Sequence, residues 1–249
     1  MNILPSQNEK IITVSIVSIC IGLIIGLIFG ANINDKNILI TSLATLSAAF
    51  FGAWLSYKLQ DNNKKIEQTK KQVQNANDLL FSIYQKLNAL IIFQRDFVDP
   101  WRDKPERIIA MEPIIDYRLP LTKIIPENIN FLLGTKYAKL LFETHIEDER
   151  FKVAEDIIKF RSNLHLNKVQ PAIHSAGIAE GDVFDSIQLK SAIGEMLYIQ
   201  LQKSTDSVIF NVDRTVESSK DLGDRLLLAL KETFPNEEFV KFILLEESV

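Results

Sequence analysis

Hydrophobic positions are concentrated near the N-terminus, in two runs that contain no charged residue. The first run is Ile11–Ala31 and the second is Ile38–Tyr57. At about 1.5 Å per residue, each run is long enough to cross the ~30 Å hydrocarbon core of a bilayer as a helix. A cleaved signal peptide is the alternative for the first run, but Phe29 stands where cleavage before Asn32 needs a small side chain. The pattern therefore predicts two transmembrane helices, over 11–31 and 38–57.

The short polar segment Asn32–Asn37 separates the two runs, and we expect a turn there that joins them as an antiparallel hairpin. Lys10 precedes the first run, and the second is followed by Lys58, Lys64, Lys65, Lys70 and Lys71. Lysine near helix ends favours the cytoplasmic side of the membrane. We therefore expect a multi-pass protein with both termini in the cytoplasm.

Small residues recur at every fourth position of each predicted span. They are Gly22, Gly26 and Gly30 on the first span and Ala44, Ala48, Gly52 and Ser56 on the second. In lipid, small residues allow the close backbone approach that holds helices together. We expect this packing within one hairpin, with packing between subunits as the alternative. Neither span contains an ionisable residue of the kind that transport needs at membrane depth, which disfavours a transporter but leaves a pore made of several copies open.

After Tyr57 the chain continues without Gly or Pro to Val98, with apolar residues at heptad spacing. These residues are Leu59, Ile66, Val73, Leu80 and Leu87, and Ala76, Ile83 and Leu90 occupy the complementary position. Pairing with another copy and packing on the chain's own domain both explain the pattern, and the denser apolar content beyond Leu79 favours the second there. We predict a polar helical stalk over 58–78 and a cytoplasmic helical domain over 79–249.

Five of the eight prolines fall between Pro100 and Pro126, which excludes one regular helix over 99–126. The apolar content of this connection predicts that it lies over a core, through Trp101, Ile108, Ile109, Met111, Ile114 and Ile115.

Helical periodicity resumes after the connection and predicts an all-α body, as an antiparallel bundle. We expect a short helix, a break at Gly134, and a long helix with an apolar stripe through Phe151, Ala154, Ile157, Ile158 and Leu164. Gln170–Asp182 is predicted to be a loop from its Pro and Gly content. Val183–Phe234 is predicted to be helical, with a bend or break at Lys203–Ser207 or at Gly223. Its apolar positions are Leu189, Ile193, Leu197, Leu201, Val208, Val212, Val216, Leu222 and Leu226.

Charge and candidate chemistry narrow the function classes. The net charge is −4, and because the stretch after the second span is basic, the remaining domain is acidic, which disfavours nucleic-acid binding. Cys20 is the single cysteine, so neither a disulfide framework nor a thiolate metal site is expected. The three histidines fit no metal pattern, and the sequence has no phosphate-binding glycine loop and no GxSxG motif. We expect no metal, no cofactor and no enzymatic activity.

Charged residues elsewhere suggest one surface and one weak site. Glu147, Asp148, Glu149, Glu155 and Asp156 alternate with Arg150 and Lys152, which is typical of a solvated helix face and not of carboxylate ligands. Arg102, Arg150 and Arg161 stand among hydrophobic residues and are candidates for a polar site. Arg102 is placed to bind an anion or to pair with Asp99 or Asp103. Structural pairing is the expected use, because buried arginine is normally paired.

Several segments between Gly52 and about Thr215 resemble a family of bacterial inner-membrane proteins. They include "FFGAWLSYKLQ", "NANDLLFSIYQKLNALIIFQRDFVDPWRD" and "RSNLHLNKVQPAIHSAGI". The resemblance implies a location in the bacterial inner membrane and carries no catalytic residue. The architecture also looks like that of the two-helix effectors of some phage-defence systems, including retron-linked ones.

Two hypotheses of function follow. The first is a membrane-anchored interaction or sensing module, whose partners are the lipid bilayer and either a second copy or an unknown protein. The second is an effector whose hairpins oligomerise and permeabilise the inner membrane.

Overall fold

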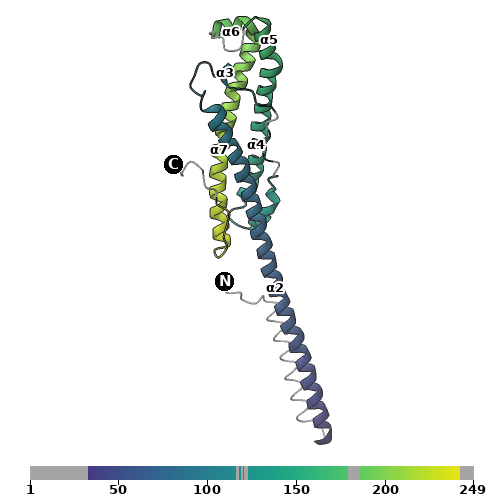
Figure 1. Ribbon diagram of the computed structural model, residues 1–249. Helices are drawn as coiled ribbons and strands as arrows, with labels where there is room; N and C mark the ends of the chain where they lie inside the picture. The colour runs from purple at the N-terminus through teal and green to yellow at the C-terminus, as the bar shows by residue number, and fades with distance from the viewer. Residues whose placement is uncertain (1–32, 116–117, 119, 121–122, 179–185, 242–249) are drawn as a thin grey trace. The chain divides into compact units, whose positions relative to one another are not determined.

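The computed structural model describes residues 33–115, 118, 120, 123–178 and 186–241, with side chains from Ile40 onward. Every regular element in these residues is a helix, and they contain no strand, which confirms the predicted all-α class (Figure 1). The chain divides into two compact units, Met1–Glu67 and Gln68–Val249, here called unit 1 and unit 2.

Helix α2, Ile33–Phe93, is continuous and contributes residues to both units. It contains the whole of the predicted second span. The turn predicted at Asn32–Asn37 is wrong for Ile33–Asn37, which are helical. These residues contain neither Gly nor Pro, so nothing in them interrupts a helix. The predicted first span, with Gly22, Gly26 and Gly30, lies outside the described residues.

Unit 2 continues from α2 through a series of shorter and longer helices. They are the π-helical turn η1 (Gln94–Val98), α3 (Arg107–Ala110), the 3-10 segment η2 (Pro126–Gly134), α4 (Lys139–Leu164), the π-helical turn η3 (His165–Val169), α5 (Gln170–Ser175), α6 (Ser186–Ile193) and α7 (Glu195–Thr233). The predicted break at Gly134 is confirmed, because η2 ends there and α4 begins at Lys139.

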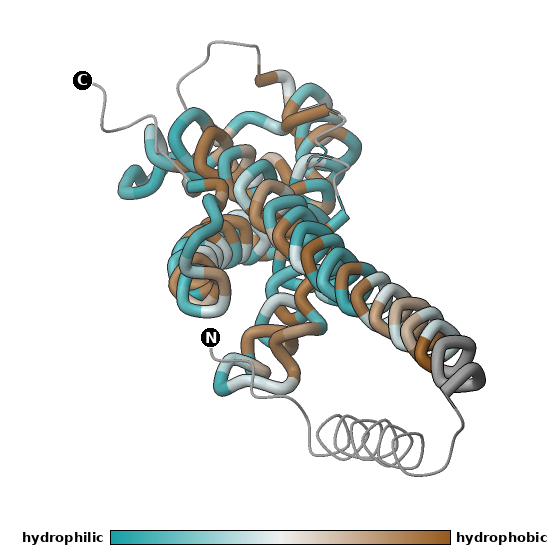
Figure 2. Tube along the Cα trace, turned by 90° about the horizontal axis from the view of Figure 1, so that it is seen from below, coloured by the Kyte–Doolittle hydropathy of each residue, from teal (hydrophilic) through white to brown (hydrophobic). Residues whose placement is uncertain are grey.

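The main core of unit 2 is formed by α2, α4 and α7. The predicted stripes are confirmed, since Phe151, Ala154 and Ile158 of α4 and Val208, Val212, Val216, Leu222 and Leu226 of α7 are all buried. On α2 the heptad residues Val73, Leu80 and Leu87 are buried in this core, as own-domain packing requires, whereas Leu59 and Ile66 are exposed. Figure 2 shows hydrophobic and hydrophilic positions alternating around the helices of unit 2, as amphipathic helices require.

A second, smaller core lies where α3, η3 and α6 pack with the adjoining ends of α4 and α7. Its buried members are Ile108, Leu164, Val169, Leu189, Ile193 and Leu201. The predicted loop at Gln170–Asp182 is wrong for Gln170–Ser175, which form α5. Pro171 lies in the first turn of α5, where proline removes no helical hydrogen bond and its fixed φ suits the helix.

The break in the last helical stretch occurs at Gly194, not at Lys203–Ser207 or Gly223. Gly194 has φ +81°, which only glycine adopts without strain, and it separates α6 from α7. Gly223 instead lies inside α7 against a side chain of α2. A Cβ atom at Gly223 would come within 2.9 Å of Cε1 of Tyr84, so glycine is required there by close packing.

The proline-rich connection covers the core as predicted. Ile108, Met111 and Ile124 are buried, and Trp101 and Ile114 pack partly buried against the main core. Ile115 is the exception, with 74% of its surface exposed.

Candidate functional site

The part of α2 in unit 1 carries large apolar side chains that face solvent. They are Ile40, Leu46, Phe50, Phe51, Trp54, Leu55 and Tyr57, exposed by 39–68%. Among the described residues, α2 is the single helix whose length and hydropathy would allow it to cross a membrane, a criterion of length and composition alone. Exposed apolar residues in such number normally mark a surface that contacts lipid or another protein.

The small-residue positions on this segment are open. Ala44, Ala48, Gly52 and Ser56 are exposed, and a Cβ atom at Gly52 would meet no described atom within 4 Å. The segment therefore has space for a close helix neighbour along these positions. Their packing against Gly22, Gly26 and Gly30 stays a prediction.

Polar residues follow the apolar segment within unit 1. Lys65 Nζ lies 2.7 Å from a carboxylate oxygen of Asp61, one turn earlier. This hydrogen bond holds the pKa of the Asp61 carboxyl below its ordinary value. Lys64 is exposed, so the helix surface after Tyr57 is cationic.

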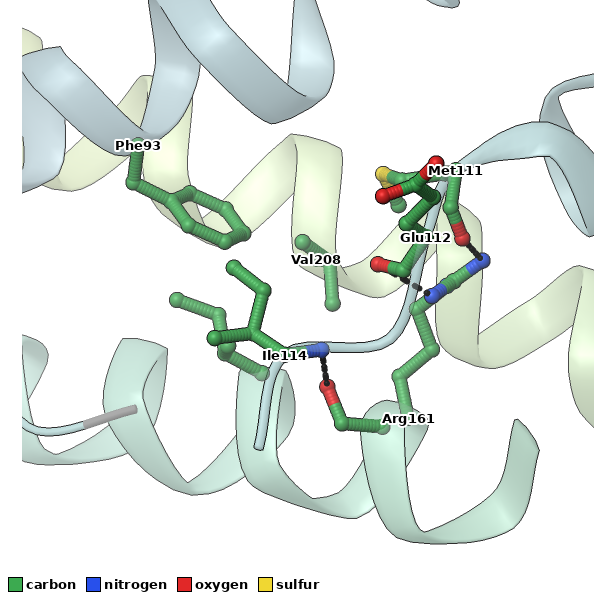
Figure 3. Close-up of a pocket in the computed structure, with 8 residues that line it drawn as sticks. Phe93, Met111, Glu112, Ile114, Arg161 and Val208 are labelled. Carbon is green, nitrogen blue, oxygen red and sulfur yellow. Dashed lines mark hydrogen bonds between the residues drawn. The ribbon is translucent and has the colours of Figure 1, made fainter. Parts of the chain in front are cut away.

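In unit 2, Arg161 of α4 holds the proline-rich connection in place. Its guanidinium donates hydrogen bonds to the carbonyl oxygens of Ile108 and Met111, at the end of α3, and to the hydroxyl of Thr205 on α7 (Figure 3). The next residue, Ser162, accepts a hydrogen bond of 3.1 Å from the backbone N–H of Ile114. Two consecutive residues of α4 thus fix Met111–Ile114 of the connection.

Arg161 is 2% exposed and contacts no carboxylate among the described residues. Burial lowers the pKa of Arg161 to about 10, which still leaves the guanidinium charged at neutral pH. The small hollow beside it, lined also by Phe93, Glu112 and Val208, has room for about one water molecule. This geometry suits a structural clamp better than a ligand site.

Arg102 joins the same connection to α7. Its guanidinium lies 2.9 Å from one carboxylate oxygen of Asp213 and 2.8 Å from Asp99, and Gln94 donates to the same Asp213. The predicted pairing with Asp99 is confirmed, and the partner Asp213 was missed because it lies far along the chain. The hydrogen bond with Asp213 raises the pKa of Arg102 above its ordinary value.

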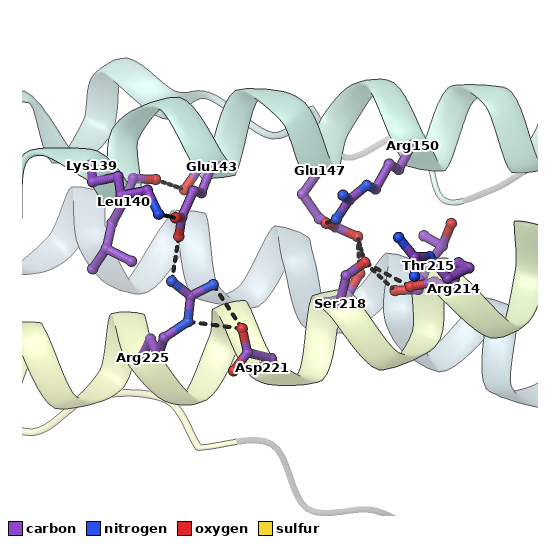
Figure 4. A network of polar contacts seen from close by, with 12 residues as sticks. Lys139, Leu140, Glu143, Glu147, Arg150, Arg214, Thr215, Ser218, Asp221 and Arg225 are labelled. Carbon is purple, nitrogen blue, oxygen red and sulfur yellow. Dashed lines mark hydrogen bonds and ion pairs between the residues drawn. The ribbon is translucent and has the colours of Figure 1, made fainter.

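Glu147 of α4 lies in a buried contact with α7. It is 2% exposed and accepts hydrogen bonds from the hydroxyls of Ser218 and Ser219, at 2.8 and 2.6 Å, and from Arg150 at 3.0 Å (Figure 4). Arg150 therefore serves in an ion pair at the edge of this interface.

Asp148, the next residue, forms an equally buried contact with α2. One carboxylate oxygen lies 3.0 Å from Lys86 Nζ, and the other lies 2.9 Å from Lys152 Nζ. Burial alone would raise the pKa of Asp148, but the hydrogen bonds with Lys152 and Lys86 outweigh it and leave the pKa below its ordinary value.

The predicted solvated face is therefore wrong for Glu147 and Asp148. Charge alternation suggested exposure, but Glu147 continues the three-and-four spacing of the buried residues Leu140, Thr144, Phe151 and Ala154. That spacing was the signal available in the sequence. Nearer the start of α4, Glu143 pairs with Lys139 and with Arg225 of α7, which also pairs with Asp221 (Figure 4).

His165 begins the π-helical turn η3, one turn after Arg161. It is 5% exposed, and neither ring nitrogen has a hydrogen-bond partner. Burial, with a smaller effect of the positive charge of Arg161, lowers the pKa of His165 to about 4, so the ring is neutral at physiological pH. Sequence reasoning had considered this histidine only as a metal ligand.

The candidate arginines do not converge on one site. Arg102, Arg150 and Arg161 each have their own partners, on α7, on α4 and in the connection. The described part of the chain contains no group of three or more His, Cys, Asp or Glu side chains that is arranged to hold a metal. The polar groups of unit 2 mainly join helices to one another, and the exposed apolar segment of α2 is the feature best suited to a function.

Comparison of the chain with protein-family models, with curated proteins and with solved structures finds no match in any of the three. The resemblance to a bacterial inner-membrane family therefore stays a prediction.

Proposed function

We propose that this chain is a membrane-anchored helical interaction or sensing module of the bacterial inner membrane. In this proposal, residues 11–31 and 38–57 form a transmembrane hairpin, residues 58–78 form a stalk, and the remainder is a cytoplasmic antiparallel helical bundle. Both termini are cytoplasmic, and the module acts by binding a protein partner or another copy.

The observation that carries the proposal is the exposed apolar surface of α2 between Ile40 and Tyr57. The best apolar window of α2 is 0% buried, whereas a core helix of a soluble protein would be mostly buried. Lipid tails would remove this surface from water at about 25 cal/mol per Å². The lysines that follow would favour the cytoplasmic side and anionic headgroups.

A second exposed stripe, on α4, supports an interaction role. Phe142, Ile146, Val153 and Phe160 are 45–64% exposed and follow one another at spacings of four and seven residues. They therefore lie on one face of the helix. A stripe of this kind is typical of a surface that packs against another helix.

Membrane fractionation with topology reporters tests the proposal. We expect the full chain to remain in the membrane fraction after alkaline carbonate washing. We also expect a C-terminal reporter that functions only in the cytoplasm to be active, and one that functions only in the periplasm to be inactive. Release of the chain into the soluble fraction, or a periplasmic C-terminus, would contradict it.

The effector function is the second candidate, and the open small-residue positions Ala44, Ala48, Gly52 and Ser56 favour it, because they leave space for helices of other subunits. Inducible expression with a membrane-potential dye separates the two functions. The effector hypothesis predicts depolarisation that Gly52→Ile abolishes and that the smaller change Gly52→Ala retains in large part. A module of the first kind leaves the potential unchanged.

A further inference from the structure

The chain after α7 turns back and lies on α2. Helix α7 ends at Thr233, and Pro235, which cannot donate a backbone hydrogen bond, stands just beyond it. A single turn, closed by the N–H of Glu237 donating to the carbonyl of Phe234, redirects the chain. We call residues Phe234–Lys241 the strap.

The strap is held through its backbone by one side chain of α2. The amide nitrogen of Asn77 donates to the carbonyl of Glu238 at 3.3 Å, and the amide oxygen of Asn77 accepts from the N–H of Val240 at 2.8 Å. These two bonds flank Phe239 on both sides. A carboxamide that pairs with the carbonyl before a residue and the N–H after it reads a peptide backbone much as a neighbouring strand does.

Phe239 supplies the apolar part of the contact. Its partly buried ring packs against the main core of unit 2. It also belongs to a row of aromatic rings, with Phe239 6.3 Å from Phe234 and Phe234 5.3 Å from Phe131 of η2. The residues on either side of Phe239 are exposed, so recognition uses one aromatic side chain and two main-chain groups.

We propose that the face of α2 around Asn77 is a peptide-binding surface, occupied here by the chain's own strap, that also takes the strap of a second copy. Neither the main-chain contacts nor the Phe239 contact depends on which chain supplies the strap. Because a single turn connects the strap to α7, exchange between two copies conserves every contact and is self-complementary. The inference rests on the proposed membrane anchorage only for the high local concentration of copies that favours exchange.

A peptide with the sequence of residues 234–241 tests the binding surface without any membrane. The labelled peptide is added to the detergent-solubilised chain, and binding is followed by fluorescence anisotropy. We expect binding to a chain that ends at Phe234 and to full-length Phe239→Ala, which weakens the resident strap. The unaltered chain should bind at least about tenfold more weakly, because its surface is occupied.

Two matched changes separate specific from adventitious binding. Asn77→Ala in the receiving chain, or Phe239→Ala in the peptide, should weaken binding at least about tenfold, since each removes a contact of the seat. Glu237→Ala in the peptide should leave binding unchanged, because the Glu237 side chain is exposed. Absence of binding to both receiving chains, or equal binding to Asn77→Ala, overturns the peptide-binding surface.

Photocrosslinking in membranes decides whether the second copy is the occupant. One tagged copy carries p-benzoylphenylalanine in place of Phe239, and a second copy carries a different tag. The proposal predicts a crosslinked species that contains both tags and that Asn77→Ala in the second copy reduces at least about tenfold. Crosslinks confined to single chains would overturn exchange, even if the peptide binds and the membrane anchorage is established independently.

Discussion

Lys86 of α2 and Asp148 of α4 form an ion pair inside unit 2, with 3.0 Å between Nζ and the carboxylate oxygen and only 10% and 9% of the side chains exposed. The ammonium group also lies 5.6 Å from the centre of the Phe151 ring. A buried pair of this kind is costly to break, because the remaining charge stays desolvated.

Lys86→Met should therefore lower the free energy of unfolding by about 3 kcal/mol. Lys152 still neutralises Asp148 and limits the loss. The double variant Lys86→Met/Asp148→Leu should recover most of the stability, since no charge is left buried. Urea denaturation of the detergent-solubilised full chain measures both values. Lys152→Met, at a 54% exposed side chain, is the matched control, with an expected loss under about 1 kcal/mol.

Gly223→Ala should destabilise the chain, although alanine is the better helix former. The added methyl would lie 2.9 Å from Cε1 of Tyr84, whose side chain is almost fully buried and has little room to move. The expected loss is about 1–2 kcal/mol, from overpacking that exceeds the gain in helix propensity. Glu217→Ala, at an exposed position of α7, is the control, and an increase in stability for Gly223→Ala would show that the ring yields.

His165 should make stability depend on pH. Its pKa is about 4 in the folded chain and near 6.5 when exposed by unfolding, so the unfolded chain binds the extra proton in this window. The contribution is complete above pH 6.5 and is lost as the pH falls toward 4, by about 2 kcal/mol between pH 7 and pH 5. His165→Leu should remove this part of the slope, measured by urea denaturation at both pH values. His174→Leu, at an exposed histidine, should leave the slope as it was.

Arg161→Lys should loosen the proline-rich connection. Lysine lacks the planar fork that reaches the carbonyls of Ile108 and Met111 and the hydroxyl of Thr205 together. We expect a loss of about 2–3 kcal/mol and faster tryptic cleavage within the connection at Arg102 or Lys104. Arg150→Lys, at an exposed side chain, is the control. Equal cleavage rates for the two variants would refute the clamp.

Much of the fold was predictable because amphipathic periodicity depends on local sequence. The stripes through Phe151 and Ile158, and through Val208 and Val212, are buried where the spacing placed them. Errors arose where one residue has two physical uses. Gly223 resembled a helix break and is a packing position, whereas Gly194 supplies the positive φ that separates α6 from α7. Pro171 indicated a loop but begins a helix.

The polar contacts were less predictable because they join residues far apart in the chain. Nothing near Arg102 points to Asp213, and nothing near Asp148 points to Lys86. The charge pattern around Glu147 resembles a solvated surface unless the helical spacing is given more weight than residue type. The two backbone bonds made by Asn77 leave no trace in the sequence, because a backbone acceptor has no residue identity.

Cysteine accessibility along α2 tests the membrane insertion of residues 40–57 most directly. Single cysteines at Leu46, Phe50, Asn62 and Glu67, in a Cys20→Ser background, are treated with a maleimide in native membranes and again after denaturation in detergent. The account predicts that the thiols at 46 and 50 react only after denaturation, because a thiolate does not form in hydrocarbon, while those at 62 and 67 react in both states. Equal reactivity of all four positions in native membranes would contradict it.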